Sequence, residues 1–162
     1  MDRKIKGYIL SVGLLWSISC SQQSTQKDIV ADNFEFAAKQ FKVMTEAMRT
    51  AVENESETSI HQRAEKGWSE LVSPRSLDEQ GKLVMVPSKD WCSGFFPGEL
   101  WYMYEYTGNP EWAALARRRT LVLEREKYNA GTHDMGFKLY CSYGNAYRLT
   151  GDTMYRDVLI RA

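Results

Sequence analysis

The sequence predicts an all-α fold in which helical hairpins are stacked one after another. The main observation is an internal repeat, because the stretch 90–108 returns in the residues that end at Gly151. The matching positions are Gly94-Phe95 with Gly136-Phe137 and Tyr106-Thr107-Gly108-Asn109 with Leu149-Thr150-Gly151-Asp152, and Asp90 and Asp134 keep nearly the same offset. Gly108 and Gly151 lie 43 residues apart. A repeat of that length, made of loop, helix, turn and second helix, is typical of stacked hairpins.

Helix start and stop signals are the second observation. Pro97 fits the first turn of a helix that ends at Gly108. Asn109 and Pro110 then fit the N-cap and the first residue of a second helix. A third helix over 136–149 and a fourth after its cap Asp152 complete the expected set.

The residues ahead of the repeat predict one long helix and one functional loop. Apolar residues recur at helical spacing over 34–51, with Asp32 as the expected N-cap, and the polar segment 53–59 ends this helix. The stretch 73–89 contains two of the four prolines. It fits either a long ordered loop or a short hairpin around 82–86. A loop of that length in a compact domain is more often functional than idle.

Composition argues against several classes of protein. Lys and Arg total 21 and Asp and Glu total 21, so no large positive field attracts phosphate and no nucleic-acid partner is expected. The arginine run 117–119 fits a solvated helix face. Two histidines and three cysteines are scattered without metal-ligand spacing, so no metal and no cofactor are expected. Cys92 and Cys141 are compatible with a disulfide, but their aromatic surroundings favour buried free thiols.

The first 20 residues are expected to be an export signal and no part of the fold. Three basic residues precede an apolar core that is too short for a stop-transfer helix. A small residue before Cys20 and a polar tract after it resemble a bacterial lipoprotein signal, in which Cys20 is lipidated. Residues 21–31 then form a tether to the domain 32–162. Because Ser17 is a weak choice where such signals prefer Leu, an ordinary signal peptide stays open as the alternative. In either case the mature chain is expected to be exported. With the lipid on Cys20 it is expected in the periplasm or at the outer membrane, and only the anchor contacts the membrane.

The residues that could carry chemistry lie in the two loops that open the repeats. Asp134 precedes the helix expected from Gly136, and on spacing alone its first interpretation is an N-cap worth about 1 kcal/mol. His133 taken alone is more often a hydrogen-bonded structural residue than a base. The matching loop supplies Asp90 and Trp91. Loops at equivalent ends of successive helices converge, so these four residues are predicted to line one pocket. There an indole stacks on a sugar ring and carboxylates bind its hydroxyls.

The chain resembles the N-terminal part of glycoside hydrolase family 88, the unsaturated glucuronyl hydrolases, in the runs PRSLDEQGKLVMVPSKDWCSGFFPGELWYMYEYTG and KYNAGTHDMGFKLYCSYGNAYRLTG. The similarity covers roughly 31–162 and is strongest from Pro74 onward. It implies an (α/α)6 toroid of six helical hairpins, of which this chain holds the first two to three. It also implies an unsaturated oligosaccharide substrate, from whose non-reducing end the 4,5-unsaturated uronic acid left by polysaccharide lyases is removed.

The resemblance also implies residue roles. Asp134 matches the first of two catalytic aspartates, and His133 and Trp91 match positions that line the uronate subsite. The implied reaction hydrates a vinyl ether, with a proton delivered to C4 and water added at C5, and the resulting hemiketal opens. At the start of a helix Asp134 is expected to be anionic and to orient water or stabilise charge, while the other aspartate is the acid.

Two departures accompany the resemblance. The second aspartate and the residues that would hold the uronate carboxylate fall after Ala162, and Cys92 stands where a small hydroxyl residue is expected. The fragment alone is therefore expected to be inactive and poorly soluble, because its last hairpin exposes an apolar face.

Two alternative functions stay open. One is an unsaturated rhamnogalacturonyl hydrolase from a related family with similar hairpins, which Trp91 and Asp134 do not distinguish. The other is a non-catalytic surface module of helical repeats that binds sugar or protein. The sequence leaves open which glycosaminoglycan, linkage and sulfation pattern is preferred, and it leaves the oligomeric state open.

Overall fold

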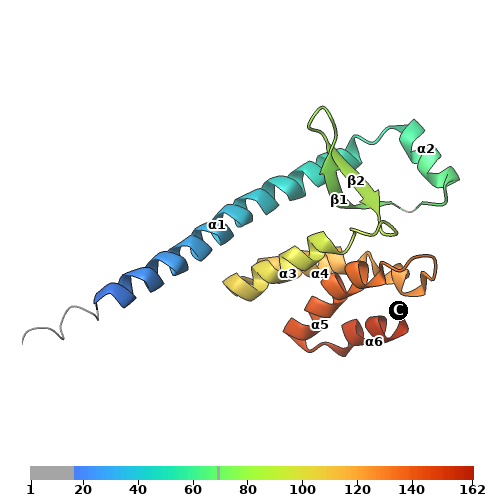
Figure 1. Cartoon of the computed structure of the whole chain (residues 1–162). Helices are drawn as coiled ribbons and strands as arrows, with labels where there is room; N and C mark the ends of the chain where they lie inside the picture. Colours follow the sequence, from blue (N-terminus) through green and yellow to red (C-terminus); the bar gives the residue numbers. More distant parts are fainter. Residues whose placement is uncertain (1–16, 69) are drawn as a thin grey trace, which may run out of the picture. The chain divides into compact units, whose positions relative to one another are not determined.

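The structure is a computed structural model that describes the backbone of residues 17–68 and 70–162, with side chains from residue 29 onward except residue 69. The chain divides into two units, residues 1–37 and 38–162. It is mainly helical, as predicted, with one two-stranded hairpin (Figure 1). In chain order the elements are α1 (Ser17–Glu53), α2 (Glu57–Glu65), β1 (Leu71–Leu77), β2 (Leu83–Pro87), α3 (Phe95–Thr107), α4 (Pro110–Leu121), the 3-10 helix η1 (Glu124–Tyr128), the π-helix η2 (Gly136–Gly144), α5 (Asn145–Thr150) and α6 (Thr153–Arg161).

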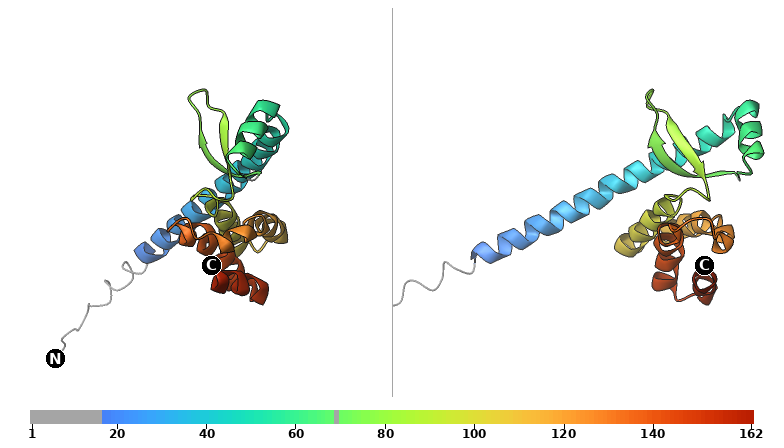
Figure 2. Two further views of the ribbon diagram at one scale, coloured as in Figure 1. Left: turned by 90° about the vertical axis from the view of Figure 1, so that its right-hand side faces the viewer. Right: turned by 45° about the vertical axis from the view of Figure 1, so that its right-hand side comes forward.

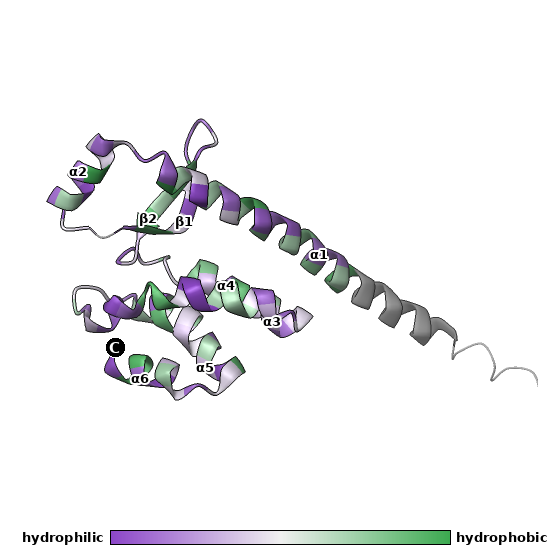
Figure 3. Ribbon diagram, turned by 180° about the vertical axis from the view of Figure 1, so that it is seen from behind, coloured by the Kyte–Doolittle hydropathy of each residue, from purple (hydrophilic) through white to green (hydrophobic). Residues whose placement is uncertain are grey.

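Helix α1 begins earlier than the sequence predicted. It starts at Ser17, so the expected N-cap at Asp32 is wrong and that residue lies inside the helix. The segment contains no Gly or Pro that would break it, and it ends at Glu53, where the polar segment begins as predicted. Hydrophobic and hydrophilic residues are mixed along its described part (Figure 3).

The N-terminal predictions lie largely outside the described residues. Residues 1–16 and the side chain of Cys20 are among those not described, so the lipidation site stays a prediction. Helix α1 continues through 21–31, and the division into signal peptide, tether and domain 32–162 also stays a prediction. None of the described helices is both long enough and apolar enough to cross a membrane.

The stretch 73–89 forms a hairpin, which was one of its two predicted structures. Strands β1 and β2 form an antiparallel hairpin (Figure 2). Their pairing contains two shifts in register. The Asp78 carboxylate fixes the turn by accepting hydrogen bonds from the backbone N–H groups of Gln80 and Lys82. Gly81 adopts a φ of 75°, which favours glycine. The segment before the hairpin, too weakly periodic to assign, holds the short helix α2.

The turns that close the two hairpins have the same geometry, which confirms the repeat. Gly108 and Gly151 are both left-handed, with φ of 65° and 69°. Each follows a threonine whose hydroxyl donates to the carbonyl four residues back and accepts from the N–H two residues ahead. Asn109 and Asp152 then cap α4 and α6 as predicted, accepting backbone N–H bonds of 2.9 and 3.0 Å.

The core lies between α3, α4, η2 and α6. Trp101, Tyr143 and Tyr155 are its largest buried side chains, and the Tyr155 ring contacts each of the other two edge to face. The Trp101 indole N–H donates to the Thr120 hydroxyl at 3.0 Å, so burial of this ring leaves no unpaired donor.

The helix predicted over 136–149 has the predicted extent but an unexpected start. Its first nine residues form the π-helix η2, and only the remainder is α-helical. Gly98 in α3 and Gly94, its N-cap residue, allow the backbones of α3 and η2 to approach closely. A Cβ on Gly98 would lie 2.6 Å from the Cys141 carbonyl oxygen, and one on Gly94 would overlap the carbonyls of Phe137 and Lys138. The start of α3 is thereby fixed against η2, which brings the two loops of the repeat together.

Candidate active site

The loops ahead of α3 and η2 share one cavity with the β-hairpin. Its volume is about 650 Å³, within the range of small-molecule sites. The lining residues are Trp68, Arg75, Val84, Met85, Val86, Pro87, Lys89, Asp90, Trp91, Asn129, Gly131, Thr132 and Asp134. Three of the four predicted site residues therefore meet in one cavity: Asp90, Trp91 and Asp134. His133 does not line it, and its side chain is 96% exposed.

Asp134 is not the helix cap that its spacing first suggested. The backbone N–H groups of Phe137 and Lys138 donate to its carbonyl oxygen, and no side chain caps η2. The carboxylate instead accepts a hydrogen bond from the Thr132 hydroxyl at 3.1 Å and lies 3.5 Å from the His133 Nε2. Because these are its partners in the described part of the chain, much of the hydrogen-bonding capacity of the carboxylate is left for a ligand in the cavity.

Asp90, the corresponding residue of the first repeat, has a carboxylate whose two oxygens are both engaged by neighbouring residues. One carboxylate oxygen pairs with the Arg75 guanidinium at 3.0 Å. The other accepts from the Cys92 backbone N–H at 3.1 Å and contacts the Cys92 thiol at 3.0 Å. Burial, and then the Asp90 carboxylate, raise the pKa of the Cys92 thiol to about 12, so this cysteine is no nucleophile at neutral pH. Cys92 and Cys141 are both free thiols, as the sequence favoured.

Three aromatic rings join the two loops. Trp91 contacts Phe95 and Phe137, the two phenylalanines at matching repeat positions, with ring centroids 5.7 and 5.9 Å away. The phenylalanine rings also contact each other at 5.7 Å. Trp91 is 44% exposed, so part of its indole surface is open at the cavity. Packing on one side and exposure on the other suit a stacking platform for a sugar.

A buried ion pair beneath the loops was missed by the sequence analysis. The Lys138 ammonium is fully buried and lies 3.2 Å from the Glu126 carboxylate. Glu126 also accepts hydrogen bonds from the Ser88 hydroxyl at 2.6 Å and the Asn129 amide at 2.8 Å. Asn129 in turn accepts from the Gly131 N–H at 2.9 Å. One carboxylate thus ties the segment before Asp90 and the segment before Asp134 to η2.

The ionisation of Glu126 follows from these contacts. Burial alone raises the pKa of the carboxyl group. Hydrogen bonds from Asn129 and Ser88 and the charge of Lys138 outweigh burial, so the pKa of Glu126 lies below its ordinary value. The network is therefore ionic in the folded protein at neutral pH. Sequence periodicity gave no signal for it, because its four members come from three separate segments of the chain: Ser88, Glu126 with Asn129, and Lys138.

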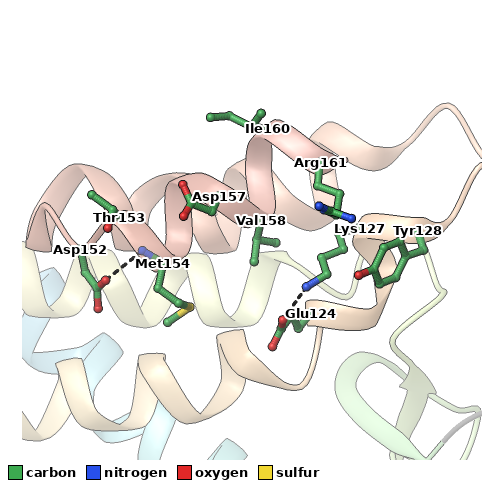
Figure 4. A pocket seen from close by; sticks show the side chains of 10 residues that line it. All are labelled: Glu124, Lys127, Tyr128, Asp152, Thr153, Met154, Asp157, Val158, Ile160 and Arg161. Carbon is green, nitrogen blue, oxygen red and sulfur yellow. Dashed lines mark hydrogen bonds and ion pairs between the residues drawn. The ribbon is translucent and has the colours of Figure 1, made fainter.

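A second, larger cavity lies apart from the predicted residues. It has a volume of about 1000 Å³ and lies between η1 and α6 (Figure 4). Each of its three acidic residues has a partner within the protein: Asp152 caps α6, Glu124 pairs with Lys127 at 2.6 Å, and Asp157 pairs with Arg156 at 2.7 Å. Among the described residues, no group of three or more His, Cys, Asp or Glu is placed to hold a metal ion.

The stacked hairpins with a cavity at the helix starts define a helical toroid, of which this chain covers part. The fold matches that of a solved unsaturated glucuronyl hydrolase specific for heparin. The TM-score is 0.55 and the identity 44%, over 72% of this chain and 30% of the other.

Curated relatives carry the same name or a similar one. The chain is 46% identical over 91 residues to the unsaturated glucuronyl hydrolase of Formosa agariphila, covering 55% of this chain and 23% of that protein. It is 30% identical over 81 residues to the unsaturated chondroitin disaccharide hydrolase of Streptococcus pneumoniae, covering 48% of this chain and 20% of that protein. No protein-family model matches the chain. These comparisons confirm the resemblance found in the sequence, although the chain spans only about a fifth of the curated relatives it matches.

Proposed function

We propose that the protein, at its full natural length, is a glycoside hydrolase that removes 4,5-unsaturated uronic acid from the non-reducing end of lyase-generated oligosaccharides. The observation that supports this best is the cavity in which Asp134 and Trp91, from two copies of one repeat, meet in a chain similar to unsaturated glucuronyl hydrolases. All three curated relatives carry hydrolase names for unsaturated uronides, which favours this substrate over rhamnogalacturonides.

The proposed reaction is hydration of the vinyl ether. A proton forms a bond to C4, the water oxygen bonds to C5, and the double bond between these carbons is lost. The product is a hemiketal at C5, which opens to a ketone as the bond from C5 to the ring oxygen breaks. The hemiacetal then formed at C1 collapses and releases the rest of the sugar as an alcohol. Because the anomeric carbon is not displaced, the rule relating carboxylate spacing to stereochemistry does not apply.

Asp134 is assigned the role of orienting the attacking water and taking its proton. Asp134 lines the cavity, and among the described residues its carboxylate has the Thr132 hydroxyl and His133 as close partners, so acceptor sites are left for a water molecule. Trp91 is assigned to stack on the uronate ring, and Asp90 to hold the loop that carries Trp91. The proton donor is assigned to the second aspartate implied by the family resemblance.

The test is the ultraviolet absorbance of the double bond, followed as the full-length protein is incubated with a lyase-generated disaccharide. The wild type is expected to remove this absorbance. Asp134→Asn should lower kcat by about 10² to 10⁴ without unfolding the protein, because the amide cannot take the proton. A wild type that binds the disaccharide but leaves the absorbance unchanged would favour the non-catalytic module. An unchanged rate in Asp134→Asn would remove Asp134 from the reaction.

The protein is further proposed to be exported and anchored by a lipid on Cys20. The basic start, short apolar core and small residue before Cys20 support this. Cys20→Ala should move the protein from the membrane fraction to the soluble fraction of its host. An unchanged distribution would argue for an ordinary signal peptide or for none.

A further inference from the structure

Asn129 lines the candidate cavity, and its side-chain amide is bonded at both ends within the protein. The amide nitrogen donates to the Glu126 carboxylate at 2.8 Å, and the amide oxygen accepts from the Gly131 N–H at 2.9 Å. A carboxylate only accepts and a backbone N–H only donates, so these partners fix which end of the amide faces which. No role in the site was predicted for this residue, although each end of its amide holds the loop that leads to Asp134.

One oxygen atom of Glu126 holds both ends of that loop. Its Oε2 accepts from the Asn129 amide, where the loop begins, and lies 3.2 Å from the Lys138 ammonium, near the start of η2. The backbone N–H of Lys138 also donates to the carbonyl oxygen of Asp134. Segment 129–138 is thereby closed into a ring through the buried carboxylate of Glu126, and Asp134 lies within the ring.

The two ends of the ring are not equally protected. The end at Lys138 is fixed by the core, because this side chain is fully buried. The end at Asn129 lies at the cavity, where the residues that follow, 130–134, are half-buried or exposed. Among the described residues, the Thr132 hydroxyl bonds within the loop, to the N–H and the carboxylate of Asp134. The Asn129 amide is therefore the side-chain hydrogen bond that joins the first half of the loop to the core.

We propose that Asn129 is a positioning residue for Asp134, setting the place of its carboxylate in the cavity by holding the start of the loop. This inference rests on the proposed function, in which Asp134 takes a proton from the attacking water. A group displaced by about 1 Å can lose about 10²-fold in rate. The loss is expected in kcat rather than in KM, because Trp91 and the other lining residues still bind the sugar.

The test uses the full-length protein and an unsaturated disaccharide whose absorbance reports the double bond. Asn129→Ala should lower kcat by about tenfold or more and change KM by about twofold or less. Asn109→Ala is the matched control, because the Asn109 amide also accepts a backbone N–H two residues ahead at 2.9 Å but caps α4 and does not line the cavity. It should lower the melting temperature by a few degrees and leave kcat within about twofold of the wild type.

A double variant separates positioning from general damage to the site. If Asn129 acts through Asp134, adding Asn129→Ala to Asp134→Asn should lower kcat by a further factor of about two at most, since the carboxylate to be positioned is already gone. A further tenfold loss would show that Asn129 acts independently of Asp134 and would overturn the proposal.

Asn129→Asp makes the positioning depend on pH. The new carboxylate faces that of Glu126, and two like charges this close repel each other until the pair takes up a proton. The shared proton replaces the lost amide donor, so kcat relative to the wild type should rise as the pH falls through the pKa of the pair. Lys138 faces the same Glu126 oxygen and lowers that pKa, whereas His133 and Asp134 titrate in both proteins and cancel in the ratio.

Three further results would overturn the proposal and leave the proposed function intact. They are a wild-type kcat in Asn129→Ala, a loss of kcat that Asn109→Ala reproduces, and a reduced kcat in Asn129→Asp whose ratio to the wild type does not change with pH. If Asn129→Ala does not fold, the ratio for Asn129→Asp at pH values where this variant is folded decides the matter. A wild type that leaves the absorbance unchanged would instead defeat the proposed function itself.

Discussion

The loops that precede α3 and η2 occupy the same position in the repeat, yet their aspartates have different surroundings. Asp90 is fixed by the Arg75 guanidinium and by the backbone and thiol of Cys92. Among the described residues, the close partners of the Asp134 carboxylate are the Thr132 hydroxyl and the imidazole of the exposed His133. The first carboxylate holds a loop, and the second is left open to the cavity.

The difference indicates how one repeated unit supports two roles. The loop of Asp90 is stabilised by its own charge pair, and it presents the indole of Trp91. The loop of Asp134 is stabilised by contacts that do not involve Asp134 itself: the Gly131 N–H donates to Asn129, whose amide donates to the buried carboxylate of Glu126. Because other residues hold this loop, the carboxylate of Asp134 keeps acceptor sites that a catalytic group needs for its ligand. The comparison therefore separates a scaffold aspartate from a candidate catalytic one.

The largest predicted effect concerns the ion pair that supports both loops. Glu126→Ala should lower the free energy of unfolding by about 3 to 5 kcal/mol, because it leaves the Lys138 ammonium buried without its counter-charge. Glu124→Ala, two residues away, breaks a half-exposed pair with Lys127 and should cost about 1 kcal/mol or less. Urea denaturation of the full-length variants measures both. Equal losses would show that the buried pair is not the support assigned to it.

The carboxylate of Glu126 also makes the free energy of unfolding depend on pH. Its pKa in the folded protein lies below the ordinary value of 4.5. The stabilisation from its ionised form is therefore fully present above pH 4.5 and is lost as the pH falls through the folded value. Glu126→Gln should lose less stability than the wild type on acidification through this window. Parallel stability curves for the two proteins would contradict the assignment.

A change in the close packing between the two repeats should lower the free energy of unfolding by a smaller amount. Gly98→Ala places a Cβ too near the Cys141 carbonyl oxygen and should cost about 2 kcal/mol through backbone displacement. Gly136→Ala is the control, since a Cβ there meets nothing within 4 Å. Thermal unfolding of the two variants should separate them by several degrees. A Gly98→Ala variant as stable as Gly136→Ala would mean that the two loops are not fixed by this contact.

Asp90 should contribute less to the free energy of unfolding, because its side chain is partly exposed. Asp90→Ala removes the pair with Arg75 and the acceptor for the Cys92 N–H, and should cost about 1 to 2 kcal/mol. Activity should fall mainly through KM, since the loop that presents Trp91 becomes looser. A variant with wild-type stability and a large loss of kcat would instead make Asp90 a catalytic residue and would remove the contrast with Asp134.

Local signals allowed much of this arrangement to be predicted from the sequence. The turns at Gly108 and Gly151 need a left-handed residue, and their caps need a short polar side chain, so adjacent residues reveal them. The repeat then implied that the loops of Asp90 and Asp134 converge. The buried network around Glu126 was not predicted, because it depends on side chains that only tertiary packing brings together. The π-helix η2 escaped for the same reason, since its close partner is the backbone of α3.

The smallest predicted change in stability is that of Asp134→Asn. This variant tests the contrast between Asp90 and Asp134 most directly. Asp134→Asn removes no cap and no paired guanidinium, and the Thr132 hydroxyl can still donate to the amide oxygen. The free energy of unfolding should therefore change by about 0.5 kcal/mol or less, while kcat on an unsaturated disaccharide falls by orders of magnitude. Stability and kcat measured on one preparation test both halves together. If stability falls as far as in Asp90→Ala, the carboxylate of Asp134 holds its loop after all, and the loss of activity no longer identifies a chemical role.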